Sequence, residues 1–281
     1  MMAAGTITGE TSVAERSESL LAAIWLKEHV DAWGAQAPGI DEMNEILRRM
    51  GRWRSRLLAN TFISHQGLRI HGGLFTGMQY IDHATEGALM PRLLGSYESE
   101  LHPHFARLAR DVDCIIDVGC AEGYYAVGLA RRAPQATVYA YDIDPEARAA
   151  CAELAARNGV ADRVVIGEVF EPTAFQDFAD RRTLVLVDTE GAEVDILQPA
   201  LAPALAGMNV IVETHDVYRP GAMAEMFVRF VPTHNVMRID QQAKAPDLPD
   251  WLKALPHLDQ LLAVWEWRAA PTPWLVMEPR R

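Results

Sequence analysis

The sequence predicts an α/β fold: a doubly wound, mostly parallel sheet of seven strands, preceded by a mainly helical N-terminal extension. Two observations carry this prediction. From about residue 101 onward, short apolar runs alternate with helix-like stretches, which is the pattern of a parallel sheet with helices on both faces. A glycine-rich segment, DVGCAEGYYAVGLA (117–130), follows directly on the first apolar run, as in the strand-to-helix turns where such sheets bind nucleotides.

The N-terminal part differs in character from the rest. Apolar positions recur at helical spacing over 14–33 and again over 41–50, which predicts two amphipathic helices. Frequent glycines over 67–95 predict turns and short strands. We therefore divide the chain into an N-terminal helical segment, 1–96, and a core, 97–281. Because each helix must bury its apolar face, the segment either packs on the core or serves as a lid or as an arm of a homodimer.

Turn and capping residues delimit the elements of the core. Asp144-Pro145 opens one helix with an N-cap carboxylate and a proline, and Asn158-Gly159 ends it. Strands are expected at 113–117, 137–141, 163–167, 184–187, 209–214, 236–239 and 274–278, and helices at 124–133, 144–158 and 223–230. Because helices separate the first five strands, those strands should be parallel.

The amino-acid composition argues against some classes of function. The 281 residues include 26 basic and 38 acidic side chains, a net charge of −12, which argues against nucleic acid as the main partner because a polyanion would be repelled. The N-terminus does not resemble a signal peptide, and no apolar run approaches the ~20 residues that span a bilayer. Cys114, Cys120 and Cys151 lack CxxC spacing and are expected to be buried thiols. We expect a cytoplasmic protein with no membrane partner.

The glycine-rich turn distinguishes between two cofactors. Nicotinamide and flavin enzymes cradle a pyrophosphate with G-x-G-x-x-G, whereas Gly119-x-Ala121-x-Gly123 is one residue shorter. Asp117 would repel a pyrophosphate but attract the ammonium and sulfonium of S-adenosylmethionine. Asp142 ends the second strand, where a carboxylate can accept both ribose hydroxyls of either cofactor. The turn and Asp117 therefore predict S-adenosylmethionine.

The adenine of this cofactor is expected beside the ends of the second and third strands. Ile143 follows Asp142, and Val169 and Phe170 follow the third strand, so that an apolar side chain there can lie against the adenine ring. Phe170 fits the hydrophobic core of the domain equally well.

Ionisable side chains gather after the fourth and fifth strands, at the edge where such sheets carry their chemistry. Asp188 and Glu190 follow the fourth strand, and His215 and Asp216 follow the fifth. His215, whose ordinary pKa lies near neutrality, can take a proton from an attacking hydroxyl, or a neighbouring carboxylate can do so. The same four side chains could instead hold a divalent cation that acidifies the hydroxyl. Since no spacing is diagnostic of a metal, we favour the metal-free scheme.

These motifs resemble those of the class I S-adenosylmethionine-dependent methyltransferases, from about Tyr97 to the C-terminus. DTEGAEVDIL (188–197) is similar to the D-x-E-G-A-E segment of FkbM-type methyltransferases, with Thr189 where that group usually has Val or Cys. The resemblance implies O-methylation of a hydroxyl on a sugar or a secondary metabolite. It also implies that Glu98 closes over the methionine end of the donor and faces its ammonium.

Three other functions are alternatives to this one. The acceptor could be an amine of a small molecule, which would make the protein an N-methyltransferase. The fold could be a non-catalytic cofactor-binding module that acts through partners, although the ionisable residues after the fourth and fifth strands count against it. The turn spacing disfavours a dehydrogenase. We therefore expect a methyltransferase that aligns and desolvates its donor and a small-molecule or sugar acceptor.

Overall fold

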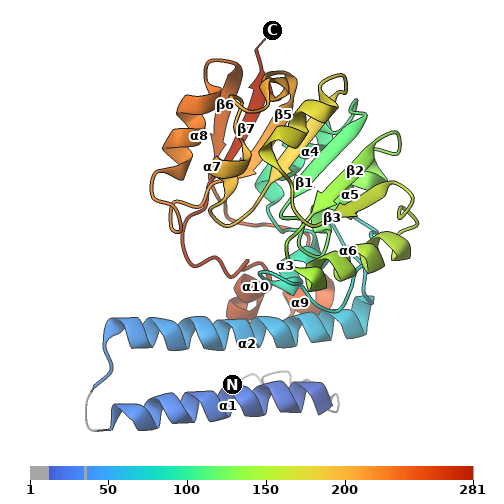
Figure 1. The fold of residues 1–281 in the computed structure, drawn as a ribbon. Coiled ribbons are helices and arrows are strands. Elements are labelled where there is room, and N and C mark those ends of the chain that lie inside the picture. Colours follow the sequence, from blue (N-terminus) through green and yellow to red (C-terminus); the bar gives the residue numbers. More distant parts are fainter. Residues whose placement is uncertain (1–12, 35–36, 281) are drawn as a thin grey trace.

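The computed structural model describes residues 13–34 and 37–280, and it confirms the predicted α/β fold (Figure 1). Seven strands form one sheet in the order β3-β2-β1-β4-β5-β7-β6. They are β1 (Cys114–Val118), β2 (Thr137–Tyr141), β3 (Val164–Gly167), β4 (Thr183–Val187), β5 (Asn209–Glu213), β6 (His234–Ile239) and β7 (Trp274–Pro279). The first five are parallel, as predicted, whereas β7 runs antiparallel to β5 and β6.

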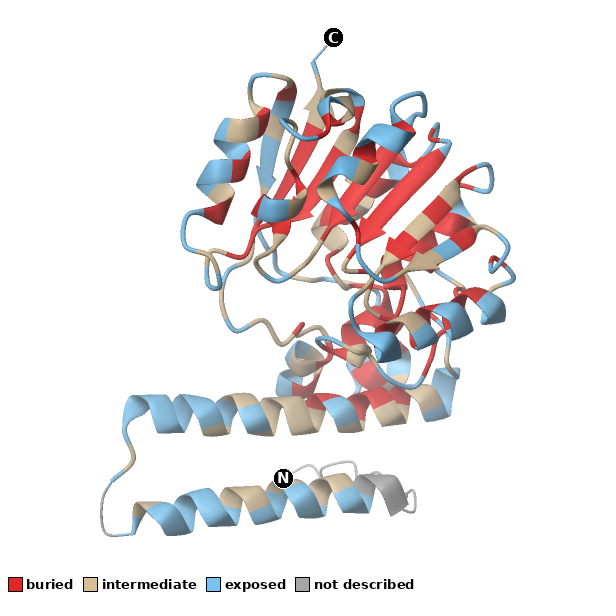
Figure 2. Ribbon diagram, viewed as in Figure 1, coloured by how far each residue is buried: buried red, intermediate tan, exposed pale blue. Residues whose placement is uncertain are grey.

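Helices cover both faces of the sheet and leave its central strands buried (Figure 2). They are α4 (His102–Leu108), α5 (Tyr124–Arg132), α6 (Pro145–Arg157), α7 (Glu193–Ile196) and α8 (Ala222–Phe230), with 3₁₀ helices at Ser99–Leu101, Pro172–Phe178 and Pro203–Gly207. Side chains of β1 alternate between two apolar clusters. Ile115 packs in the cluster that contains Ala126 of α5, and Ile116 in the cluster that contains Met226 of α8.

Capping residues fix α6 where the sequence predicts. Asp144 Oδ1 accepts a hydrogen bond from the Glu146 N–H at 2.9 Å, and Pro145 occupies the first turn. Past the other end, Gly159 has a φ of 65°, a left-handed conformation that glycine adopts without a steric penalty. The cap leaves Asp142 at the end of β2, next to the glycine-rich turn.

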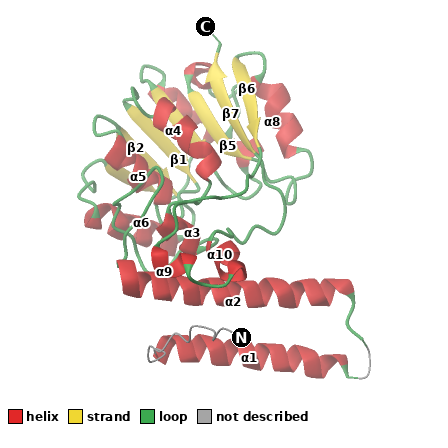
Figure 3. Ribbon diagram, turned by 180° about the vertical axis from the view of Figure 1, so that it is seen from behind, coloured by secondary structure: helices red, strands yellow, loops and turns green. Residues whose placement is uncertain are grey.

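The N-terminal helices lie beyond the carboxyl edge of the sheet, as both views show (Figures 1 and 3). α1 (Val13–Trp33) packs on α2 (Ile40–Gln66), and α2 packs on α3 (Leu89–Leu94) and α10 (His257–Ala263), which follows α9 (Asp250–Lys253). The buried residues of α2, such as Leu58 and Phe62, lie in its C-terminal half. Over 67–95, where the sequence predicts turns and short strands, the structure has one antiparallel bridge, Arg69–Gln79, and the helix α3, so the prediction is wrong for 89–94.

The cysteines agree with a further prediction. All three cysteines are buried free thiols, and burial raises the pKa of the Cys114 thiol to about 11, which keeps it protonated at neutral pH. Among the helices of the described residues, none is both long and apolar enough to cross a membrane.

Candidate functional site

The glycine-rich turn joins β1 to α5 and requires its glycines. A Cβ at Gly119 would lie 1.6 Å from the backbone oxygen of Asp188, and one at Gly123 would lie 2.8 Å from Cys151 Sγ. Both glycines also have positive φ, 84° and 93°, which disfavours other residues. The N–H groups of Gly119 and Cys120 donate to the Tyr141 carbonyl at 2.8 and 3.0 Å. The turn is therefore clamped between the ends of β2 and β4.

Asp142 lies beside this turn, as predicted. Its Oδ2 accepts a hydrogen bond from the Ala121 N–H at 2.9 Å and its Oδ1 accepts one from the Asp144 N–H at 2.9 Å. Each oxygen has a second lone pair with which it can accept a ribose hydroxyl. Ile143 and Val169, at the same edge, are exposed. Phe170 is buried in the core, with its ring 4.5 Å from that of Phe175, so of its two predicted roles the structure shows the core one.

Asp117 lines a small cavity of about 30 Å³ under the turn. Its carboxylate is buried, and its Oδ2 has no hydrogen-bond partner among the described residues. Burial, with a smaller contribution from Asp142, raises the pKa of Asp117 to about 7. A buried carboxylate oxygen without a partner suits a cationic ligand group such as an ammonium.

Glu98, which the family resemblance assigned to this ammonium, lies elsewhere. Its buried carboxylate accepts hydrogen bonds from the Tyr125 hydroxyl and the Arg268 guanidinium, and it does not line the small cavity. Burial raises its pKa to about 8, against the opposing effect of Arg268. Because Glu98 is already paired, it is not available to a ligand.

Two residues of the small cavity that the sequence did not indicate, Glu86 and Arg92, come from the N-terminal segment. Glu122, in the turn itself, holds that segment in place: it accepts hydrogen bonds from the Tyr80 hydroxyl at 2.5 Å and the Thr85 hydroxyl at 2.7 Å, and pairs with Arg92 at 3.1 Å. Burial alone would raise the pKa of Glu122, but Arg92 and the two hydroxyls lower it. Glu122 is a charged residue in a turn of small residues, and this feature of the sequence could have indicated that its side chain contacts another segment.

Three ionisable side chains come together after β4 and β5: Asp188 and His215, which the sequence predicts as site residues, and Glu213. His215 Nε2 lies 3.5 Å from Glu213 Oε2 and 3.7 Å from Asp188 Oδ1. On the other side of the ring, Nδ1 lies 2.5 Å from Glu193 Oε1. The sequence did not indicate Glu213 and Glu193 as site residues. Glu213 ends β5 two places before His215, and the period of two along a strand, which puts both side chains on one face, could have revealed it.

The protonation state of His215 differs from that of the proton acceptor that the sequence predicts. Burial would lower the pKa of His215, but its hydrogen bonds with Glu193 and Glu213 outweigh this and raise the pKa to about 10. The imidazole is therefore protonated at neutral pH. Burial and the charge of Glu213 raise the pKa of Asp188, which faces this imidazolium.

Asp216 does not belong to this cluster, contrary to the prediction. Its two carboxylate oxygens accept hydrogen bonds from the Gly221 N–H at 2.9 Å and the Met223 N–H at 3.2 Å, at the start of α8. A carboxylate there satisfies N–H groups that the helix leaves unpaired. Glu190 is exposed and lies beside Tyr218, at the edge of the site.

The predicted four-residue metal set is therefore not assembled. Instead, Asp188, Glu213 and His215 offer ligand atoms within 4.8 Å of one another. Glu213 is paired with Arg268 and accepts a hydrogen bond from Thr272 at 2.6 Å. The guanidinium of Arg268 places a positive charge beside this trio, which opposes a divalent cation.

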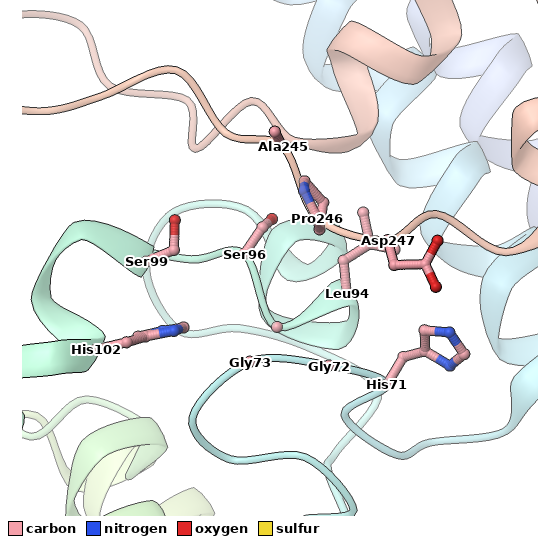
Figure 4. Close-up of a pocket in the computed structure, with 11 residues that line it drawn as sticks. His71, Gly72, Gly73, Leu94, Ser96, Ser99, His102, Ala245, Pro246 and Asp247 are labelled. Carbon is pink, nitrogen blue, oxygen red and sulfur yellow. The ribbon is translucent and has the colours of Figure 1, made fainter. Parts of the chain in front are cut away.

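Two cavities meet at this cluster. The larger, of about 440 Å³, lies over the ends of β4 and β5 and is lined by Asp188, Glu190, Glu213 and His215, among others. It shares Glu86, Tyr97 and Asp188 with the small cavity under the turn. A separate cavity of about 310 Å³, lined by His71, His102 and Asp247 among others (Figure 4), shares no lining residue with either. The chemistry is therefore expected where the first two cavities join.

Comparison with known proteins adds a domain match and distant structural likenesses. No curated protein sequence matches the chain. The solved structures similar to it include an O-methyltransferase from Bacillus cereus in complex with SAH (10% identity, TM-score 0.45, covering 92% of this chain and 100% of that one). They also include the O-methyltransferase TomG from Streptomyces achromogenes, involved in tomaymycin synthesis, in complex with SAM (15%, 0.43, 64% and 81%), and an rRNA methylase from Streptococcus thermophilus (11%, 0.45, 65% and 96%). Likenesses this distant carry no argument about the acceptor.

The sequence match is more direct. Residues 115–208 match the family model described as a methyltransferase domain. This range contains the glycine-rich turn, Asp117, Asp142 and Asp188. These are the residues that the structure places around the small cavity or beside its turn. Residues 115–208 of the α/β core are thus similar to a methyltransferase domain.

Proposed function

We propose that the protein transfers a methyl group from S-adenosylmethionine to a hydroxyl of a small molecule, with a sugar or a secondary metabolite as the acceptor, as the FkbM-type resemblance implies. The observation that carries the proposal is the junction of the two cavities. Glu86, Tyr97 and Asp188 line both of them. The small cavity would receive the ammonium end of the methionine part of the donor and the large one the acceptor, so that the reacting groups meet beside Asp188.

The residues around the turn fit this donor. The unpartnered, buried oxygen of Asp117 suits the ammonium of the methionine part. Asp142, at the end of β2, suits the ribose hydroxyls, and the exposed Ile143 and Val169 suit the adenine ring. The bound donor supplies an electrophilic methyl group on a sulfonium. Each of these assignments is a prediction that a single substitution can test.

Asp188 is the residue we assign as the proton acceptor. When the hydroxyl oxygen bonds to the methyl carbon, the carbon–sulfur bond breaks and the hydroxyl proton must leave. Asp188 lines both cavities, and its raised pKa makes the ionised carboxylate a stronger base. His215, protonated and 3.7 Å away, stabilises that ionised form. His215 thus takes a positioning role in place of the proton-accepting role predicted from the sequence.

Two measurements test the proposal. Calorimetry should show micromolar-range binding of S-adenosylmethionine and of its demethylated product, and no binding of NAD. Transfer of a labelled methyl group should then be compared between matched pairs of acceptors, such as a sugar and its amino analogue. Transfer to the hydroxyl supports the proposal. Tight binding of NAD, or transfer only to amines, would overturn it.

A further inference from the structure

One end of the large cavity is built by residues from outside the α/β fold. Arg52 and Arg56, one helical turn apart on α2, line it together with Trp267. The guanidinium carbons of the two arginines lie 5.8 and 5.3 Å from the centroid of the Trp267 ring, within the range of a cation–π contact. None of the three lines the small cavity, so this basic and aromatic end lies away from the donor.

The two arginines differ from two other arginines of α2. Arg48 pairs with Glu45 at 3.2 Å, and Arg54 pairs with Asp259 at 2.7 Å. Among the described side chains, those of residues 16–34 and 37–280, no carboxylate forms an ion pair with Arg52 or Arg56, in a chain of net charge −12. The buried Arg52 Nε and Trp267 Nε1 also have no hydrogen-bond partner there. Buried donors without partners in a cavity wall indicate a missing acceptor.

The donor end of the same cavity includes acidic side chains. Glu86 and Asp188, which border the small cavity, are both acidic. A molecule with one anionic group and one hydroxyl would therefore be oriented by the cavity itself. Its anionic group would be attracted to the arginines, and its hydroxyl would point toward Asp188.

We propose that Arg52, Arg56 and Trp267 form an oxyanion-binding subsite that holds a phosphate or carboxylate group of the methyl acceptor. The inference rests on the proposed function, since it treats the large cavity as the acceptor site. The guanidinium fork matches the geometry of an oxyanion, and the Trp267 ring offers a flat apolar face to the rest of the molecule. The acceptor class is thus an anionic hydroxylated small molecule, with the anionic group remote from the hydroxyl that is methylated.

The test measures binding of simple probes to protein saturated with the demethylated donor. Phenyl phosphate, benzoate and phenol carry the same ring with a phosphate, a carboxylate and no strong anion, respectively. We expect the better anionic probe to bind at least tenfold more tightly than phenol. In the double variant Arg52→Gln/Arg56→Gln, that preference should be lost. A preference for phenyl phosphate over benzoate assigns the subsite to phosphate, and the reverse assigns it to carboxylate.

The matched control is Arg48→Gln/Arg49→Gln, which removes the same charge from the same helix at residues that do not line this cavity. It should bind the probes as the wild type does. Equal binding of phenol and both anions, or an equal effect of the two double variants, would overturn the subsite. If Arg52→Gln/Arg56→Gln does not fold, the single variant Arg56→Gln replaces it, because Arg56 is exposed. This variant should lower the affinity for the anionic probe at least threefold. An unchanged affinity would overturn the subsite. Failure of the protein to bind the demethylated donor would instead count against the proposed function, because the probes can be titrated without it.

Discussion

Burial sets the charge of the residues around the donor. Asp117 and Asp188 both line the small cavity, and burial is the largest cause of the raised pKa of each. A cationic donor between them would favour their ionised forms. Asp117, with a pKa of about 7, is therefore partly protonated at neutral pH, and a bound cation should displace this proton.

Donor binding should accordingly release protons. Because the pKa of Asp117 is about 7, this residue is largely protonated at pH 6.5, and a nearby ammonium should lower its pKa. Calorimetry in buffers of different ionisation enthalpy counts the protons released. Asp117→Asn should reduce the count for S-adenosylmethionine and for its demethylated product alike. Asp188→Asn should remove the difference between the two ligands, because only the donor has the sulfonium. An unchanged count in both variants would contradict this account.

The roles assigned to Asp188 and His215 predict unequal effects on turnover. Asp188→Asn should lower kcat by about 10²–10⁴, the contribution typical of a general base, while affinity for the demethylated donor changes little. His215→Gln should lower kcat less, because the carboxylate remains. Steady-state kinetics on both variants decides between them. A larger loss in His215→Gln would restore His215 as the proton acceptor.

His215 should also make stability depend on pH. Its pKa is about 10 in the folded protein and near 6.5 when unfolded, so the protonated form favours folding. This contribution is fully present below pH 6.5 and is lost as the pH rises toward 10. Chemical denaturation of the wild type and His215→Gln should show a stability difference that shrinks over that window. A difference that stays constant from pH 6 to 10 would show that the histidine is not held as an imidazolium.

At the scale of elements, the glycine-rich turn holds the ends of β1 and β4 in close contact. Gly119→Ala should lower the free energy of unfolding by more than the ~1–2 kcal/mol of a left-handed alanine, because its Cβ would lie 1.6 Å from the Asp188 carbonyl oxygen. Donor affinity should fall with it, since Asp188 borders the donor cavity. Gly159→Ala is the control: its φ is 65° but nothing lies within 4 Å of the added Cβ. Equal losses in the two variants would mean that the close contact has no role.

Local signals were enough to predict the elements, but only part of the site. The Asp144 cap, the apolar strands and the turn depend on neighbours in the chain, so the sequence predicts them and the structure confirms them. From the sequence alone, Asp216 could equally be a site residue or a helix cap. Its role as a cap follows only from where α8 begins. Arg52 and Glu86 reach the site from the N-terminal segment. No pattern of neighbouring residues in the sequence predicts such a contact. The charge of His215 likewise depends on Glu193, which lies 22 residues away in the chain.

At the scale of the whole molecule, Arg268 joins parts of the chain that lie far apart in sequence. Its guanidinium pairs with Glu98, Glu213 and Glu266, and all three carboxylates are buried. Lys244 adds a second cation, 3.0 Å from Glu266. The segment 244–268, which includes α9 and α10, is thereby tied to the start of the core and to the end of β5.

Replacing Arg268 should therefore destabilise the entire fold. Arg268→Gln leaves three buried carboxylates near one another with too few cations, and breaking a buried pair in this way typically costs about 3–5 kcal/mol. The loss should depend on pH. Without the guanidinium, the pKa values of these carboxylates rise in the folded variant but not in its unfolded chain. The folded variant therefore binds more protons than its unfolded chain as the pH falls. The variant should come closest to the wild type in mild acid and fall behind as the pH rises through 8, the pKa of Glu98 in the intact protein.

The matched control removes an arginine from an exposed ion pair. Arg107 pairs with Glu278 at 2.6 Å, with the two side chains 52% and 34% exposed, and such pairs are worth about 0–1 kcal/mol. Arg107→Gln should therefore change the free energy of unfolding little at any pH. Denaturation curves of both variants from pH 5 to 9 make the comparison. If Arg268→Gln lost no more stability than Arg107→Gln, or lost the same amount at every pH, the buried carboxylates would not depend on Arg268 for their charge. The segment 244–268 would then be held by its apolar contacts alone.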